Sequence, residues 1–426
     1  MKAKVLEVVT NYYLKSGNFS GISLESLSQE IFSNEYNLIN ILSELIEQNE
    51  IGLISQKHSI NPHINRLGFS LCQDQLECLH KKDVHHTCFY PTKKHLKNVV
   101  KEINYVGQPF QLMLALGNPQ LTIENFDLSI IELYRNDPRY YYVANDIGGS
   151  LGTEDEFYKS DKFKITDQVH IQSFGFSYND ERRRALCAFI CDLADLSSEH
   201  QLIWKAKHLK ENYEPHPAFY NSQVRNIWPK GVNILTAVIQ EIYTINRITK
   251  MIWSLPLFKD DFGAYGERRP RKFSFLIRPT LEEYNYFISL FDKVISDNLN
   301  HKFFKGKVIK EYDERRKSDD KIIVKYKGSI LMLDEWIRSL MRFPDDTGWI
   351  NSISAFKEVR KQRQNPAHKI EEDIYDQKYF KLQEEIIDKV WAGLNYLRII
   401  LQQHPNCNEE KLDIPEWQRE NYIYSM

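Results

Sequence analysis

Apolar residues follow helical spacing in three stretches near the beginning of the chain. They predict helices over residues 4–15, 24–32 and 36–48, because this spacing places the apolar side chains on one face of each helix. Ser23 precedes the second stretch, where its hydroxyl can accept a hydrogen bond from the first helical turn. The short apolar run 51–55 predicts a strand. The first 58 residues are therefore expected to form three short helices followed by a strand.

This order of elements resembles a winged helix-turn-helix domain, whose third helix would enter the major groove of DNA. The third predicted helix and its end carry four acidic residues and no Lys or Arg, namely Glu35, Glu44, Glu47 and Glu50. Phosphates repel such a surface. We therefore expect residues 1–58 to form a winged-helix-like module that docks a protein partner or dimerises, with DNA binding as the less favoured alternative.

Residues 59–275 contain both stretches with helical spacing of apolar residues and short apolar runs typical of strands. They are expected to form a central α+β domain. Three apolar runs predict strands, at 110–116, 128–134 and 140–144. Helices are predicted over 185–196 and 232–253, and Ser197 is a candidate cap for a further helix. The pattern does not specify the order of the strands.

Residues 278–404 show helical spacing almost throughout. Four helices are predicted, over 280–299, 328–342, 349–363 and 377–403. Thr280 is the candidate cap of the first helix, and the basic connection 301–327 contains a short predicted strand at 322–324. Four helices of this length suit an up-and-down bundle, with residues 405–426 as a C-terminal tail.

Composition narrows the class of protein. The 426 residues are 42% hydrophobic and 13% aromatic, which excludes a disordered chain. The 56 Lys and Arg residues are balanced by 58 Asp and Glu residues, so any contact with nucleic acid needs a local basic patch. No apolar run has the length of a membrane helix, no signal peptide is recognisable, and six cysteines are too few for a disulfide scaffold. We expect a cytoplasmic, multidomain, mainly helical protein with no membrane partner.

The strongest chemical signal lies at the end of the third helix of the predicted bundle. There the helical pattern stops at Arg363, and His368 follows after four residues that include Gln364 and Asn365. In a four-helix context this spacing resembles the Arg-x(4–6)-His motif of HEPN domains. Many HEPN domains are metal-independent ribonucleases of toxin and phage-defence systems. The polar residue that usually follows the Arg directly is Gln364 here, with Asn365 one place further on.

The resemblance implies that residues 278–404 form an HEPN-like bundle that cuts or binds RNA in a bacterial stress or antiviral defence system. The implied catalytic residues are Arg363, His368 and Asn365, and the implied chemistry needs no metal and no cofactor. A guanidinium can stabilise the charge of a phosphorane, and an imidazole can move a proton to or from the ribose 2′-hydroxyl. The flanking basic residues are candidates for binding the RNA backbone: Lys357, Arg360, Lys361 and Lys369.

A single histidine is the weak point of this chemistry, because transesterification needs both an acid and a base. A symmetric homodimer would supply the second histidine. In the competing interpretation, His368 caps the third helix and Arg363 pairs with a carboxylate of the bundle. The protein would then be a non-catalytic sensor or adaptor that docks a partner through its N-terminal module.

Two further motifs are weaker. Six potential zinc ligands fall close together, namely Cys72, Cys78, His80, His85, His86 and Cys88, but their spacing matches no familiar zinc framework. The run Gly148-Gly149-Ser150-Leu151-Gly152 matches the nucleophile elbow of α/β-hydrolases. The elbow needs a strand directly before the serine and a helix directly after it, and the surrounding sequence favours a turn instead.

Overall fold

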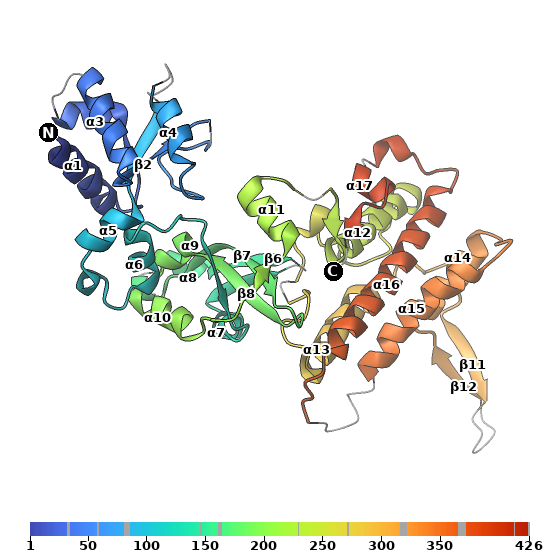
Figure 1. The fold of residues 1–426 in the computed structure, drawn as a ribbon. Coiled ribbons are helices and arrows are strands. Elements are labelled where there is room, and N and C mark those ends of the chain that lie inside the picture. Colours follow the sequence, from blue (N-terminus) through green and yellow to red (C-terminus); the bar gives the residue numbers. More distant parts are fainter. Residues whose placement is uncertain are drawn as a thin grey trace. The chain divides into compact units, whose positions relative to one another are not determined.

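The computed structural model describes residues 1–31, 35–57, 59–80, 86–144, 147–160, 164–228, 230–270, 272–315, 322–364, 372–412 and 414–424. The chain forms two compact units (Figure 1). The N-terminal unit comprises Met1–Tyr142 and Gly148–Asn226, and the C-terminal unit comprises Val143–Ile147 and Ile227–Met426. Helices and several β-sheets are both present, which confirms the predicted mixed fold class. In the described part of the chain, no helix combines the length and the apolar character needed to cross a membrane.

The beginning of the chain contains the three predicted helices, α1 (Lys2–Lys15), α2 (Leu24–Ile31) and α3 (Glu35–Glu47). They pack on an antiparallel sheet of order β1-β3-β2. Its strands are β1 (Ile22–Ser23), β2 (Ile51–Ser55) and β3 (Thr87–Pro91). The central strand β3 follows a segment that contains α4 (Cys72–Leu79). This sheet therefore includes residues beyond 58, the last residue of the predicted N-terminal module.

A six-stranded sheet follows, of order β4-β8-β7-β6-β5 with β9 paired to β7. Its strands are β4 (Ile123–Phe126), β5 (Tyr140–Ala144), β6 (Gly148–Thr153), β7 (His170–Tyr178), β8 (Arg184–Phe189) and β9 (Glu214–Pro215). The helices of this region are α5 (Lys93–Val99), α6 (Pro109–Ala115), α7 (Ile130–Arg135), α8 (Asp155–Tyr158), α9 (Ile190–Ala194), α10 (Ser198–Ala206) and α11 (Pro217–Arg225). Strand β5 confirms the strand predicted at 140–144.

The strands predicted at 110–116 and 128–134 are wrong, because these runs form α6 and α7. Both runs are short and partly buried, and periodicity alone does not distinguish a short apolar strand from a short apolar helix. Pro109 occupies the first turn of α6, a position that proline favours. The helix predicted at 185–196 is partly wrong, because its first half is strand β8. The predicted cap is confirmed: the hydroxyl of Ser197 accepts a hydrogen bond from the backbone of α10.

All four helices predicted for residues 278–404 are present. They are α13 (Leu281–Ile295), α14 (Ser329–Leu340), α15 (Thr347–Gln364) and α16 (Lys378–Gln402). Thr280 caps α13 as predicted, because its hydroxyl accepts a hydrogen bond from the backbone of Glu283. Helix α12 (Ile234–Trp253), which the prediction placed in the central domain, shares one hydrophobic core with these four helices.

The C-terminal residues fold back onto this core. Leu412 and Ile414 are buried in it, α17 (Glu416–Arg419) follows, and β13 (Ile423–Tyr424) pairs in parallel with β10 (Val232–Asn233). The strand predicted at 322–324 is confirmed as part of β12 (Ile322–Tyr326), which pairs with the unpredicted β11 (Glu311–Arg315).

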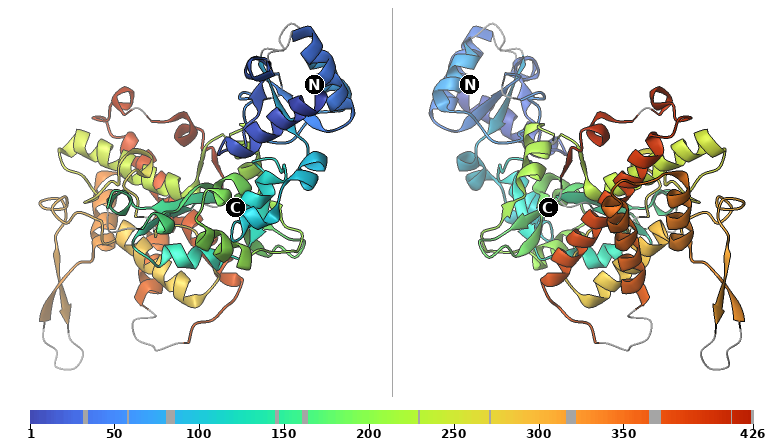
Figure 2. Two further views of the ribbon diagram at one scale, coloured as in Figure 1. Left: turned by 90° about the vertical axis from the view of Figure 1, so that its left-hand side faces the viewer. Right: turned by 90° about the vertical axis from the view of Figure 1, so that its right-hand side faces the viewer.

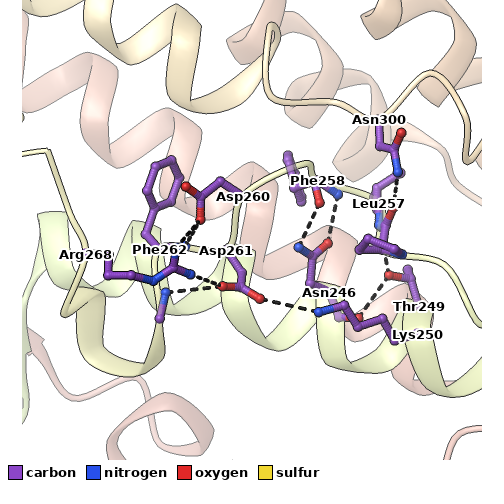
Figure 3. A network of polar contacts seen from close by, with 12 residues as sticks. Asn246, Thr249, Lys250, Leu257, Phe258, Asp260, Asp261, Phe262, Arg268 and Asn300 are labelled. Atoms are coloured by element: carbon purple, nitrogen blue, oxygen red, sulfur yellow. Dashed lines mark hydrogen bonds and ion pairs between the residues drawn. The ribbon is translucent and has the colours of Figure 1, made fainter.

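The loop after α12 is held firmly to that helix (Figure 3). The side-chain amide of Asn246 donates a hydrogen bond to the carbonyl of Phe258 at 2.9 Å and accepts one from its N–H at 2.8 Å. Further along the loop, Arg268 lies 3.2 Å from Asp260 and 2.9 Å from Asp261. The charge of Arg268 is therefore balanced within the loop.

Candidate functional site

Arg363 lies in the last turn of α15 and Arg360 lies just before that turn, at the end of the third predicted helix of the bundle. Residues three apart are neighbours on a helix surface, so the two guanidinium groups project from the same side. The apolar face of α15 holds the helix in the core through Trp349, Ile353, Phe356 and Val359. Cations in a last turn also interact favourably with the negative end of the helix dipole.

Both arginines bind the same two carboxylates at the C-terminal end of α13. Nη1 of Arg363 lies 2.6 Å from Oδ2 of Asp292 and 2.6 Å from Oδ2 of Asp297. Nε of Arg360 lies 3.0 Å from Oδ1 of Asp292, and its Nη2 lies 2.7 Å from Oδ1 of Asp297. We refer to these four residues as the arginine–aspartate cluster. The cluster joins the ends of α13 and α15.

Burial and charge act in opposite directions on Asp297, a member of the cluster. The side chain of Asp292 is fully buried, whereas that of Asp297 is 40% exposed and those of the two arginines are 33% exposed. Burial alone would raise the pKa of Asp297, but the hydrogen bond from Arg363 and the charges of both arginines outweigh it and hold that pKa below its usual value. The same hydrogen bonds raise the pKa of Arg363. The positive charges of the two arginines and the negative charges of the two aspartates therefore nearly cancel within the cluster.

Part of the Arg363 guanidinium remains available. Its two ion pairs both use Nη1, and within the described ranges neither Nε nor Nη2 donates a hydrogen bond to another residue. The Arg363 side chain is 33% exposed, which leaves part of it open to a ligand anion. Such an anion would meet a guanidinium that already faces two carboxylates, so the attraction at long range would be weak.

The other residues implied by the HEPN resemblance are placed only in part. Asn365, His368 and Lys369 lie outside the described residues. Lys357 and Lys361 are exposed on α15, and neither forms an ion pair with another residue that the structure describes. Arg360, predicted to bind an RNA backbone, belongs to the arginine–aspartate cluster.

Asp292 and Asp297 were missed at the sequence level, although Asp292 carried a signal. It lies among the apolar residues Phe291 and Ile295 on the buried side of a predicted helix. A carboxylate in such a position needs a cationic partner. The sequence does not show which cation fills that role, because Arg360 and Arg363 lie far along the chain.

The six potential zinc ligands are described only in part. Cys72 is exposed, Cys78 and Cys88 are buried, and His85 lies outside the described residues. Burial raises the pKa of the Cys88 thiol to about 12. In the part of the chain that is described, no three Cys, His, Asp or Glu residues are grouped as metal ligands.

The hydrolase elbow is absent, because the run from Gly148 to Gly152 is strand β6 rather than a strand-to-helix turn. A Cβ atom on Gly148 would lie 2.2 Å from the carbonyl oxygen of Phe174 on the neighbouring strand. This glycine therefore permits close packing of β6 against β7.

The N-terminal unit contains an open pocket of about 340 Å³, lined in part by His63, Cys191 and Asp195. Burial raises the pKa of Cys191 to about 12, so its thiol remains protonated and a poor nucleophile at neutral pH. The adjacent carboxyl of Asp192 is also perturbed. Burial raises its pKa to about 6, a hydrogen bond from the backbone of Ser173 opposes the shift, and the charge of Asp195 adds to it.

This shift predicts that Asp192→Asn stabilises the protein at pH 7.5. A raised pKa means that ionisation of Asp192 opposes folding, so its cost is absent below about pH 4 and complete above about pH 6. The amide should therefore increase the free energy of unfolding by up to about 3 kcal/mol at pH 7.5 and have only a small effect at pH 4. Urea unfolding at both pH values measures the difference. The exposed Asp180→Asn is the control, and equal effects of the two variants would contradict the prediction.

The chain matches no protein-family model, no curated protein and no solved structure. Its function must therefore be inferred from its own residues.

Proposed function

We propose that the C-terminal unit is an HEPN-like bundle that binds and cuts RNA, as a toxin or antiviral effector of a bacterial stress or defence system. The main support is the position of Arg363. It lies at the end of the third of four helices, Asp292 and Asp297 both bind Nη1 of its guanidinium, and its side chain is 33% exposed. The reaction would be a metal-independent transesterification.

In this proposal each motif residue has a distinct role. The two carboxylates orient Arg363 before RNA binds, so Nε and Nη2 can donate to the scissile phosphate without reorganisation. A nearly neutral cluster attracts a phosphodiester monoanion weakly and interacts more strongly with the dianionic transition state, which favours catalysis over tight substrate binding. His368 would carry the proton, and the amide of Asn365 would donate a further hydrogen bond.

A second candidate function is a non-catalytic sensor or adaptor. The observation in its favour is that Arg363 and Arg360 are equally engaged by Asp292 and Asp297, as expected if the cluster only joins two helices. The N-terminal module would then supply the function. Its three helices and its β1-β3-β2 sheet support a winged-helix-like module, and α3 exposes acidic rather than basic side chains. This favours a protein partner over DNA.

A matched pair of variants separates the two candidates. Arg360 and Arg363 bind the same carboxylates, but only Arg363 belongs to the Arg-x4-His motif. If the bundle cuts RNA, Arg363→Gln should slow cleavage by roughly 100-fold or more, because a transition-state donor is lost. Arg360→Gln should slow it less than about tenfold. Cleavage of single-stranded RNA in EDTA, with a cyclic phosphate product, is the measurement, and thermal unfolding by circular dichroism checks that both variants are folded.

The opposite pattern would favour the adaptor. Equal losses of thermal stability together with equal cleavage rates would show that the cluster is only structural. Absence of cleavage by the wild-type chain would also count against the nuclease.

A further inference from the structure

The hairpin of β11 and β12 extends away from the helices of the C-terminal unit (Figures 1 and 2). Its strands are antiparallel, and Tyr312 lies opposite Lys325. A hydrogen bond of 2.8 Å from the N–H of Lys327 to the carbonyl of Lys310 continues the ladder toward the base of the hairpin. An ion pair of 2.7 Å between Lys327 and Glu335 fixes the base to α14.

The two faces of the hairpin differ in charge. Side chains alternate between faces along a strand, and residues opposite each other on paired strands share a face. By this register, one face carries the positions of Lys310, Lys325 and Lys327 together with Tyr312, Glu314 and Ile323. The other face carries the positions of Glu311 and Asp313 together with Arg315, Ile322, Val324 and Tyr326. We call the first of these the basic face.

Positive charge gathers around the base of the hairpin. The preceding segment contributes the exposed Lys302 and Lys305. Burial and the charges of Lys259 and Lys310 hold the pKa of the neighbouring His301 below its usual value, which indicates a positive potential. An anionic ligand would be attracted here.

The basic face also offers an aromatic ring. Tyr312 is 41% exposed. Lys310 lies two residues before it in the chain, and Lys325 lies opposite it on the paired strand. An isolated two-stranded hairpin is at best marginally stable in water. Contact with a partner would stabilise it, and lysines beside an exposed ring suit a chain of phosphates and bases.

We infer that the basic face of the hairpin binds single-stranded RNA, with Lys310 and Lys325 on the phosphates and Tyr312 stacked on a base. Such pairing of cations with an aromatic ring is the usual means of holding single strands without sequence preference. The inference rests on the proposed function and extends it with a second RNA contact. An acidic protein segment would use the lysines but would gain little from the ring, so RNA is favoured.

The test uses the full chain and a fluorescent 2′-O-methyl oligouridylate of about 20 nucleotides, long enough to span a typical binding site. This probe cannot be cut, because the nucleophilic hydroxyl is blocked, so binding is measured independently of cleavage. Fluorescence anisotropy should show roughly tenfold weaker binding by Tyr312→Ala. Tyr312→Trp should retain the affinity. Tyr326→Ala, on the opposite face, is the matched control and should bind as the wild type does.

The contribution of the two lysines is measured by the salt dependence of binding. Each phosphate contact with a single strand contributes about 0.7 to the slope of log affinity against log salt, so Lys310→Gln with Lys325→Gln should reduce that slope by roughly 1.4. Lys4→Gln with Lys381→Gln removes the same charge from exposed positions of α1 and α16 and should leave the slope unchanged.

Three results would overturn the inference: equal losses from Tyr312→Ala and Tyr326→Ala, no loss from Tyr312→Ala, or binding of a polyglutamate peptide in place of RNA. Failure of the nuclease proposal would look different. In that case no RNA would be cut, while the oligouridylate would still bind and respond to Tyr312→Ala.

Discussion

Replacement of His368 by alanine is expected to slow RNA cleavage by roughly 100-fold to 10,000-fold, the range that general acid–base catalysis contributes. The motif contains one imidazole that can exchange a proton near neutral pH, and no metal is expected to activate the 2′-hydroxyl instead. The measurement is the single-turnover rate on single-stranded RNA at pH 7 in EDTA. DNA should remain uncut by the wild type, because it lacks the nucleophile.

A matched histidine provides the control. His86 is exposed in the N-terminal unit, and His86→Ala should cleave RNA at the wild-type rate. If each active site needs a histidine from both protomers of a homodimer, an excess of the His368→Ala chain should lower the rate of the wild-type chain as mixed dimers form. A monomer that cuts RNA would contradict the shared site. Undiminished cleavage by His368→Ala would exclude the nuclease assignment.

Replacement of Arg398 by alanine is expected to destabilise the protein by about 3–5 kcal/mol. Nε of Arg398 lies 2.7 Å from Oε2 of Glu241, which has a side chain that is only 1% exposed. Asn395 donates a hydrogen bond of 3.3 Å to the other oxygen of Glu241, and Arg398 also reaches the carbonyl of Gln418. The pair joins α12 to α16 at the centre of the C-terminal unit, so loss of the guanidinium would leave a buried carboxylate without its cation.

The effect of Arg398→Ala should depend on pH. Burial raises the pKa of Glu241 even though Arg398 opposes the shift, and removal of Arg398 should raise it further. The destabilisation should therefore be largest above that raised pKa and should shrink as the pH falls toward about 4.3, the ordinary value for glutamate. Urea unfolding at pH 7.5 and pH 5 measures this trend.

Two controls define the origin of the Arg398 effect. Glu241→Leu combined with Arg398→Met should recover most of the stability, because both charges leave the core together. Lys389→Ala breaks an exposed ion pair of 3.0 Å with Glu358 and should cost less than about 1 kcal/mol. If Arg398→Ala cost no more than Lys389→Ala, the buried pair would not have the importance assigned to it.

The long amphipathic helices were determined by the sequence alone. Helices α12, α13, α15 and α16 each repeat an apolar face over several turns, and no strand could bury the same residues on one side. Caps set by local chemistry were equally visible, as at Thr280 and Ser197. The Arg-x4-His spacing could also be recognised from the sequence, because its residues lie close together in the chain.

The tertiary structure decided those features that depend on contacts between residues far apart in the chain. The short apolar runs of α6 and α7 suit a strand or a helix equally, and only the surrounding core selects the helix. Strand β3 becomes the centre of its sheet because β1 and β2 pair with it from either side. Arg363 meets Asp292 and Asp297 only because α13 and α15 pack together. No local pattern encodes which carboxylate a given arginine meets, since that pairing is fixed by the packing of helices that lie far apart in the chain.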